Sequence, residues 1–487
     1  MSTEHSGTDT GRAEREGRED TEGSRKDTED TDVSGGAGTE TAEGSAETVE
    51  AASETPDAAP PPPLEAHDLT AELPAAPEPR SARFVRELTN GSAAITVLAI
   101  FAALVIGAIL IVVTDKSTLD ALPYFFARPT DTFKAIGSAV GGGYAALFRG
   151  GIYDYSQSSF SGGIESLLHS LSFATPLIAA GIGIGIGFRA AVFNIGGQGQ
   201  MLAGGAVAGW LAYALPIPAI LHIPVAVIAA LVGGAVAAGI AGVLKATTGA
   251  HEVIVTIMLN YIAFYLISWM LRTQGLLQAP GSNNPKTPAM KETAILPALF
   301  GPQFNLHFGF ILVIGATILV WWILSRSNLG FKFRAVGLNP NAARVAGIDV
   351  KNMYVYAMLI AGALAGLAGV NQVLGTITTG FSADIDAGIG FDAITVALLG
   401  RSTPWGTFAA GILFGAFKAG GYSMQAAEQI PVEIVTVVQS VIVLFIAAPP
   451  LVRTIFFLPS PERDRRRAEK ARQKELKAEV QAEEVAS

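Results

Sequence analysis

The sequence has no cysteine among its 487 residues, which excludes disulfide bonds, thiolate metal sites and a cysteine nucleophile. Its 6 histidines show no spacing typical of a metal site, and no Gly-x-x-x-x-Gly-Lys-Ser/Thr phosphate loop is present. Charge is also scarce, because Asp, Glu, Lys and Arg make up only 15% of the residues. We therefore expect no metal, no cofactor, no nucleic-acid partner and no ATP hydrolysis by a phosphate loop of this chain.

The charges that exist are concentrated at the N-terminus. Residues 1–79 carry 21 of the 42 acidic residues but only 5 of the 33 basic ones. A segment of low hydrophobicity and high net charge cannot bury enough apolar surface to offset the entropy lost on ordering. We predict that 1–79 is a disordered acidic extension rich in Pro, Gly and Ser, which either solvates the chain or docks a partner.

The rest of the chain contains 7 uncharged runs of 18 residues or more. A bilayer crossing needs about 20 residues of helix, so these runs predict an all-α polytopic integral membrane protein. The membrane domain is expected over 80–459, followed by a charged cytoplasmic tail over 460–487. About ten spans are expected, some of them short, at about 92–113, 166–188, 200–215, 223–244, 252–271, 308–324, 353–375, 389–400, 405–421 and 432–449.

Basic residues give this topology an orientation, since Lys and Arg that flank a span stay in the cytoplasm. Arg189, Lys245, Arg401 and the cluster between Arg326 and Lys351 all fall in loops predicted to be inside. Both termini are therefore expected in the cytoplasm, with a multi-pass chain in the membrane. The segments 125–148, 272–307 and 389–421 are expected to form, in that order, an interfacial helix, an ordered external loop and two short or broken helices.

Two glycine-rich or capped stretches stand out between the spans. Asn194, Gln198 and Gln200 lie in a Gly-rich run between apolar segments, where amides suit either a turn or the polar lining of a pathway. The second stretch is the inside loop over 326–351. Asn339 is a good N-cap, Pro340 suits the first helical position and Gly347 suits a left-handed terminator.

These signals in the inside loop predict a two-turn helix over about 340–346. So short a helix is marginal alone in water, so a partner surface is expected to stabilise it; a capped loop without a partner is the alternative. Its candidate contact residues are Asn339, Pro340, Ala342, Ala343, Arg344 and Gly347, with Ala342, Ala343 and Ala346 expected to lie closest to the partner.

Several polar side chains fall inside the predicted spans, where such groups are costly and mark functional candidates. Asp392 is the sharpest of them, although its place after Gly390-Phe391 also suits the cap of the following helix. Together with the amides of the Gly-rich run, the candidate pathway residues are Asn194, Gln198, Gln200, Asn260, Asn371, Gln372, Asp392 and Thr395.

Four stretches resemble the permease subunits of bacterial ABC importers for nucleosides and simple sugars, a family that also includes branched-chain amino acid permeases. They are FNIGGQGQ (193–200), HEVIVTIMLN (251–260), RAVGLNPNAARVAGI (334–348) and GFDAITVALLG (390–400). The resemblance implies a permease that works with a separate ATP-binding cassette ATPase, a second permease copy or a related permease, and an extracytoplasmic substrate-binding protein. It also implies that the capped loop engages the ATPase, and Gln198 stands where many members carry an acidic residue.

The function expected is a translocation pathway, without enzymatic activity of its own, for a small neutral polar solute. Uncharged amides orient a hydroxylated substrate without an opposing charge, which favours a nucleoside or simple sugar over a charged amino acid. The alternative is an ion-coupled secondary transporter. That class normally has several buried carboxylates or a histidine relay, whereas Asp392 is nearly alone.

Overall fold

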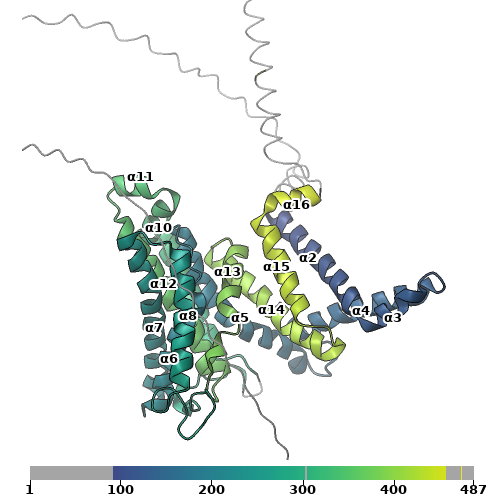
Figure 1. The fold of residues 1–487 in the computed structure, drawn as a ribbon, viewed down its shortest axis with the longest axis horizontal. Coiled ribbons are helices and arrows are strands. Elements are labelled where there is room, and N and C mark those ends of the chain that lie inside the picture. Colours follow the sequence, from purple (N-terminus) through teal and green to yellow (C-terminus); the bar gives the residue numbers. More distant parts are fainter. Residues whose placement is uncertain (1–91, 302–303, 457–472, 474–487) are drawn as a thin grey trace, which may run out of the picture. The chain divides into compact units, whose positions relative to one another are not determined.

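The computed structural model describes residues 92–301, 304–456 and 473, so the extension predicted over 1–79 and almost all of the predicted tail lie outside the described residues. Regular structure in the described part is helical (Figure 1). The longer helices are α2 (Ser92–Thr114), α4 (Pro129–Gly151), α5 (Phe160–Arg189), α6 (Gly197–Ala214), α7 (Ala219–Thr248), α8 (Glu252–Leu271), α9 (Gly309–Arg326), α10 (Asn328–Leu338), α12 (Val350–Val370), α13 (Ile389–Leu399), α14 (Pro404–Glu428) and α15 (Glu433–Ala447). Shorter ones are α3 (Lys116–Ala121), η1 (Leu122–Tyr124), η2 (Glu292–Ala294), α11 (Pro340–Val345), η3 (Asn371–Thr376), η4 (Ala383–Asp386) and α16 (Pro449–Ile455).

The all-α polytopic architecture expected from the uncharged runs is confirmed. Each predicted span coincides with a helix. Within the described residues, 6 stretches are long and apolar enough to cross a membrane, with a shorter apolar helix over Glu433–Ile446. The six are Val97–Thr114, Phe160–Arg189, Ala219–Thr248, Glu252–Leu271, Gly309–Arg326 and Val350–Thr376.

The Gly/Pro-punctuated region over 389–421 forms one short helix and one long one. α13 has 11 residues, about 17 Å of helix, and cannot cross a hydrocarbon core of about 30 Å. α14 has 25 residues, because Thr403 caps its start, Pro404 occupies the first helical position and the helix continues to Glu428. The expectation of a broken helix is therefore confirmed for 389–400, whereas the second segment is a continuous helix.

The helices α6, α7, α8 and α12 lie side by side (Figure 1). Glycines bring the backbones of α7 and α12 into contact: a Cβ on Gly366 would lie 2.1 Å from the carbonyl oxygen of Ala230. On the opposite helix, a Cβ on Gly234 would lie 2.2 Å from the carbonyl oxygen of Gly362. Close backbone approach at small residues is the usual basis of helix association in membranes, and here it fixes the position of α12.

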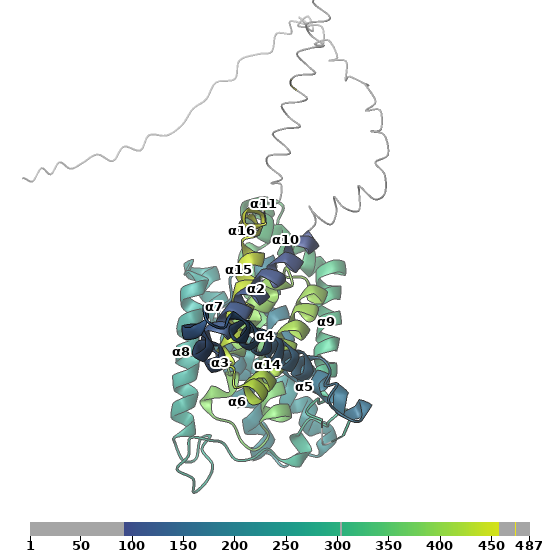
Figure 2. The ribbon, with the colours of Figure 1, turned by 90° about the vertical axis from the view of Figure 1, so that its right-hand side faces the viewer.

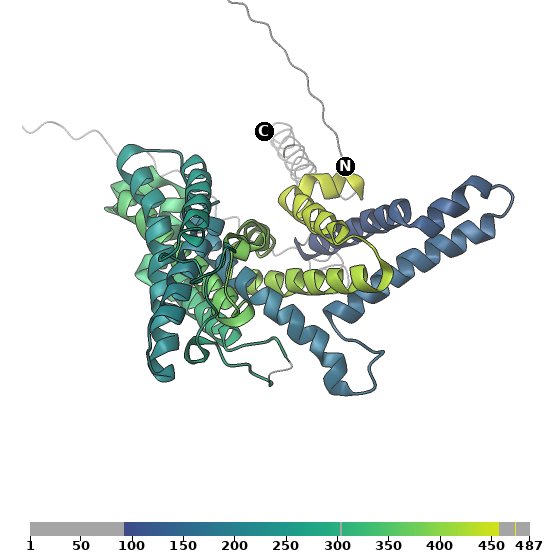
Figure 3. The same cartoon turned by 60° about the horizontal axis from the view of Figure 1, so that its bottom comes forward.

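A second group of helices brings the N- and C-terminal parts of the described chain together. α2 packs along α15, blue and yellow in Figure 3. Most of the segment over 125–148, which is expected as an interfacial helix, forms α4, and α4 packs against α14. Buried Ile111, Met424 and Ile442 belong to the apolar cluster between these helices. The second group positions α14, which carries part of the cavity described below.

The connections between helices lie at two opposite ends of the membrane domain. α10, α11 and α16 lie at one end, and the loop that follows α8 lies at the other (Figures 1 and 2). This loop, expected over 272–307, is irregular apart from η2 in its described part. The segment predicted to be cytoplasmic and the segment predicted to be external are thus on opposite ends.

Candidate functional site

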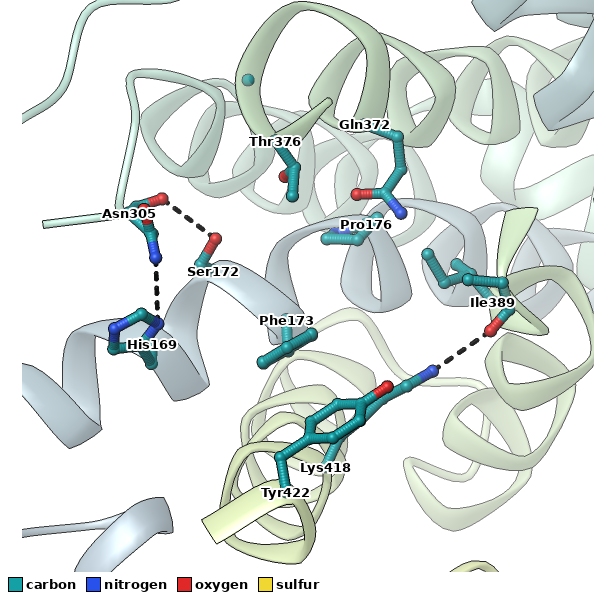
Figure 4. Close-up of a pocket in the computed structure, with 12 residues that line it drawn as sticks. His169, Ser172, Phe173, Pro176, Asn305, Gln372, Thr376, Ile389, Lys418 and Tyr422 are labelled. Atoms are coloured by element: carbon teal, nitrogen blue, oxygen red, sulfur yellow. Dashed lines mark hydrogen bonds between the residues drawn. The ribbon is translucent and has the colours of Figure 1, made fainter. Parts of the chain in front are cut away.

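A cavity lies between α5, the end of α12, α14 and the segment that precedes α13 (Figure 4). Its volume is about 220 Å³. A single water needs roughly 10–15 Å³ on this measure, so the cavity has room for a small solute. It is lined by His169, Ser172, Phe173, Pro176, Asn305, Gln372, Gly375, Thr376, Ala387, Ile389, Lys418 and Tyr422.

The end of α12 supplies an amide and a hydroxyl to the cavity because the helix changes its winding there. α12 continues into η3, a π-helical turn over Asn371–Thr376, and such turns are frequent at functional sites. Gln372 and Thr376 lie about one turn apart along one wall (Figure 4). The amide nitrogen of Gln372 donates to the carbonyl oxygen of Ile385 at 3.3 Å, which ties η3 to the segment before α13. Gln372 is thus a predicted pathway residue that lines the cavity.

Hydrogen bonds from α5 close one end of the cavity. Ser172 Oγ donates to the backbone oxygen of Asn305 at 3.0 Å, and Asn305 Nδ2 lies 3.2 Å from Nδ1 of His169 (Figure 4). Asn305 belongs to the loop before α9, so these contacts fasten that loop to α5. This end of the cavity is therefore lined by a hydroxyl, an amide and an imidazole.

The opposite end of the cavity carries an ion pair between α13 and α14. Lys418 Nζ lies 3.4 Å from Oδ2 of Asp392 and 3.3 Å from the carbonyl oxygen of Ala387, to which it donates. The carboxylate of Asp392 thus compensates the charge of Lys418 at this end of the cavity. The interpretation of Asp392 as a helix cap is wrong, since α13 has no capping hydrogen bond from it. Thr395 Oγ1 donates to the Asp392 backbone oxygen at 2.6 Å, within α13.

A carboxylate that the sequence analysis missed shapes the turn before α13. Asp386 is buried and accepts hydrogen bonds from the backbone N–H groups of Gly388 at 3.1 Å and Gly390 at 2.8 Å. Ala387 and Gly388 both have left-handed backbone, with φ of 46° and 80°. The run Asp-Ala-Gly directly before an apolar helix is the signal that could have predicted this turn.

Aromatic rings form the remaining wall. Phe173 of α5 and Tyr422 of α14 are stacked, with ring centroids 5.7 Å apart and an interplanar angle of 28°. Both rings line the cavity on the side that faces Gln372 and Thr376 (Figure 4). The cavity is therefore amphipathic, with an aromatic wall and hydrogen-bonding groups at its other sides.

A second hollow of about 480 Å³ adjoins the cavity on the side of the loop before α9. Asn305 and Gly375 line both spaces. His307, 3% exposed, lines the second hollow, and burial lowers its pKa to about 4, so that its imidazole is neutral at pH 7. Within the described residues, neither ring nitrogen of His307 nor Oδ1 of buried Asn371 has a hydrogen-bond partner. Buried polar groups of this kind commonly bind ordered water.

The predicted amides of the Gly-rich run gather apart from this cavity. Asn194 Nδ2 donates to Oε1 of Gln200 at 3.0 Å, and Nε2 of Gln200 donates back to Oδ1 of Asn194 at 2.9 Å. Asn194 Oδ1 also accepts from the Gly196 N–H at 2.9 Å. This bond closes a turn, which is one of the two structures that the sequence analysis considered for these amides. Gln198 is half-buried, and its backbone nitrogen would lie 2.3 Å from a Cβ on Gly390, so the 193–200 stretch packs against the start of α13.

One face of α8 holds the 193–199 backbone in place. Its polar residues recur every four positions, which places them on one side of the helix. Glu252 Oε1 and Thr256 Oγ1 accept backbone N–H groups of the segment at 3.3 Å each. Asn260 Oδ1 accepts from the Gly199 N–H at 2.8 Å, and its Nδ2 donates to the Ile195 oxygen at 2.9 Å. Asn260 therefore joins α8 to the start of α6.

Replacing Asn260 by leucine is expected to destabilise the membrane domain. The backbone N–H of Gly199 and the oxygen of Ile195 would each lose a partner, and an unsatisfied buried group costs about 1–3 kcal/mol. The apparent melting temperature of the detergent-solubilised protein should fall. Tyr261→Leu, at the exposed neighbouring position, is the matched control and should stay within about 0.5 kcal/mol of wild type. Equal melting temperatures for both variants would contradict the role assigned to Asn260.

The short helix predicted in the inside loop is confirmed as α11. Asn339 Oδ1 accepts from the backbone nitrogens of Asn341 at 3.0 Å and Ala342 at 3.1 Å, Pro340 occupies the first helical position, and Gly347 has a φ of 79°. Arg344 is exposed, and its Nη1 lies 3.4 Å from Oδ1 of Asn341. The local signals read from the sequence were sufficient because the cap and terminator form within the loop.

The expected orientation of the α11 side chains needs one correction. Ala343 is 3% exposed and packs in the main apolar cluster of this chain, so it is not available to a partner, whereas Ala342 and Ala346 are exposed. Two apolar residues that the sequence analysis missed are far more exposed: Leu338 at 87% and Val345 at 91%. Contiguous exposed apolar side chains mark interaction surfaces.

The chain matches the family described as branched-chain amino acid transport system / permease component over residues 166–447. It is 36% identical to a guanosine ABC transporter permease protein of Bacillus subtilis over 323 residues, which cover 66% of this chain and 89% of that protein. A nucleoside ABC transporter permease protein of Lactococcus lactis is 35% identical over 321 residues, 64% of this chain and 88% of its own. A glucose ABC transporter permease protein of Haloferax volcanii is 34% identical over 282 residues, 56% and 73% of the two chains. No solved structure matches the chain significantly.

Proposed function

Since this chain belongs to the family of branched-chain amino acid transport system permease components, we propose that its cavity is part of the path of a nucleoside or simple sugar. The observation that carries this proposal is the pair of adjoining hollows, which share Asn305 and Gly375. One hollow lies beside the loop predicted to be external, and the other lies among α5, η3 and α14. The path leads from the first hollow to the second.

The chemistry of the cavity supports a neutral polar solute. Its donors and acceptors are amides, hydroxyls and an imidazole, and its cation, Lys418, is paired with Asp392. The names of the three relatives mention guanosine, nucleoside or glucose, and all of these compounds are neutral and hydroxylated. Of the residues predicted for the pathway, Gln372 has the leading role because it lines the cavity, and Asn371, Asp392 and Thr395 have supporting roles in the neighbouring helical segments.

A separate ATPase subunit powers the transport, and α11 is its docking element. Leu338, Ala342, Val345 and Ala346 are exposed at the end of the membrane domain that carries α10 and α11 (Figure 2). A partner that covers Leu338 and Val345 removes two large apolar side chains from water, which favours docking. ATP is hydrolysed on that subunit, so this chain is a transport subunit and not an enzyme.

The remaining partners follow from the same arrangement. An extracytoplasmic binding protein delivers the solute at the loop over 272–307, and a second permease, either a copy of this chain or a relative, completes the pathway in the bilayer. α16 lies at the same end as α11, which supports a cytoplasmic C-terminus (Figures 1 and 2). Gln198, Asn194, Gln200 and Asn260 have a supporting role in holding the start of α6.

Uptake by whole cells tests this proposal. A strain that lacks the gene should lose uptake of labelled guanosine or glucose, and the intact gene should restore it. Uptake should survive collapse of the proton and sodium gradients as long as ATP is present. Uptake that stops with the gradients while ATP remains would overturn the proposal in favour of an ion-coupled transporter.

A further inference from the structure

We propose that the stacked rings of Phe173 and Tyr422 are a platform for a planar heteroaromatic base, so that the cavity selects a nucleoside over a simple sugar. The inference rests on the proposed function, because it assigns the substrate class of the same cavity. It makes Tyr422 and Phe173 specificity-determining residues, a role that neither their sequence context nor the names of the relatives assigns to them.

The ring geometry carries the first step. The two rings come from different helices, α5 and α14, yet lie 5.7 Å apart at 28°, so two aromatic rings meet at one wall of the cavity. Tyr422 is about half exposed, which is unusual for a ring whose only task is to fill a core. Aromatic side chains bind bases by stacking because every base has a π face.

The groups around the platform carry the second step. Gln372 lies across the cavity from the rings, and Lys418 lies beside Tyr422 with its Nζ directed to the carbonyl oxygen of Ala387 at the edge of the cavity (Figure 4). Amide side chains bind the edge of adenine, and Lys binds the O6 and N7 acceptors of guanine. The Asp392 carboxylate lies 3.4 Å from the ammonium of Lys418 and compensates the ammonium's charge, so the ammonium can donate hydrogen bonds to an uncharged ligand.

The far end of the cavity suits the other half of a nucleoside. Ser172, His169 and Asn305 are hydrogen-bonding groups that lie away from Lys418 and Gln372 (Figure 4). A nucleoside has a flat base with edge acceptors and a ribose with hydroxyls, which matches an aromatic wall with polar groups at both ends. A simple sugar has hydroxyls on all sides and no π face, and leaves the aromatic platform without a stacking partner.

The first test uses the full importer with its ATPase and binding protein in proteoliposomes, with labelled guanosine and labelled glucose as probes. Tyr422→Leu should lower guanosine uptake at subsaturating concentration by about 5- to 150-fold. Tyr422→Phe keeps the ring and should retain uptake within about twofold, and so should Tyr261→Leu, a matched loss of an exposed ring on α8. The yield of assembled importer should be the same for all four proteins.

The outcomes separate this inference from the proposed function. Unchanged guanosine uptake in Tyr422→Leu, or a wild type that moves glucose and not guanosine, overturns the inference while the importer function stands. A wild type that moves neither probe with ATP overturns the proposed function itself. If Tyr422→Leu does not assemble, a measurement on the wild-type importer tests the inference instead.

That measurement is photolabelling of the wild-type importer with an azido purine nucleoside. The label should appear in peptides from α5 or α14 that contain Phe173 or Tyr422. Excess guanosine should abolish the labelling and excess glucose should leave it unchanged. Label confined to other peptides, or displaced equally by glucose, overturns the platform.

Discussion

Gly366→Leu is expected to abolish the accumulation of folded protein in the membrane. A Cβ at this position would lie 2.1 Å from the carbonyl oxygen of Ala230, an atom of the α7 backbone that cannot rotate away. Overpacking of a tightly packed contact commonly costs about 1–3 kcal/mol and more where the backbone has to move. Separating α7 from α12 also displaces η3 and with it the wall of the cavity. Size-exclusion profiles of a fluorescent fusion measure the effect as loss of the monodisperse peak.

Gly315→Leu is the matched control for this substitution. Gly315 lies in α9, another apolar helix, and a Cβ there meets no atom within 4 Å. The profile of this variant should resemble that of wild type, because the side chain extends into open space. Equal losses from both glycines, or none from either, would contradict the close approach of α7 and α12.

Val345→Glu is expected to uncouple the permease from its ATPase while leaving the membrane domain folded. Val345 is 91% exposed in the free chain, so the substitution disturbs no internal contact. If the ATPase covers this position, the new carboxylate becomes an unpaired buried charge, which is strongly destabilising for the complex. Co-purification with the ATPase should decrease at least tenfold, which corresponds to about 1.4 kcal/mol, and ATP-driven uptake should fall with it.

Two further variants define what the Val345 experiment reports. Thr248→Glu adds the same charge at an exposed position at the end of α7, outside α11, and should leave co-purification unchanged. Ala343→Glu places a carboxylate in the apolar cluster of this chain, so it should lower the stability of the permease even without the ATPase. Normal assembly of Val345→Glu with the ATPase would show that α11 does not dock there.

The helices and their caps could be predicted from the sequence because their causes are local. Uncharged runs of about 20 residues require helices in a bilayer, and Asn339, Pro340 and Gly347 specify α11 within one loop. The family was recognisable for a similar reason, since its motifs are contiguous stretches. What local pattern could not supply was orientation, and Ala343 therefore appeared as exposed as Ala342.

The cavity could not be predicted because its residues come from five separate parts of the chain. Phe173 and Tyr422 are ordinary aromatic residues in apolar helices until α5 and α14 pack and bring their rings together. Asn194 and Gln200 are predicted pathway residues whose amides pair with each other in a turn. A polar residue in a span can line a path or support a neighbouring backbone, and the packing of the helices decides between the two.

The most direct test of the central claim is accumulation of labelled guanosine in proteoliposomes that contain this permease, its partner permease and ATPase, with the binding protein outside and ATP enclosed. The account predicts accumulation above the external concentration that requires hydrolysable ATP, persists without an ion gradient and disappears when this chain is omitted. Accumulation that needs an ion gradient and proceeds without the ATPase would contradict the account.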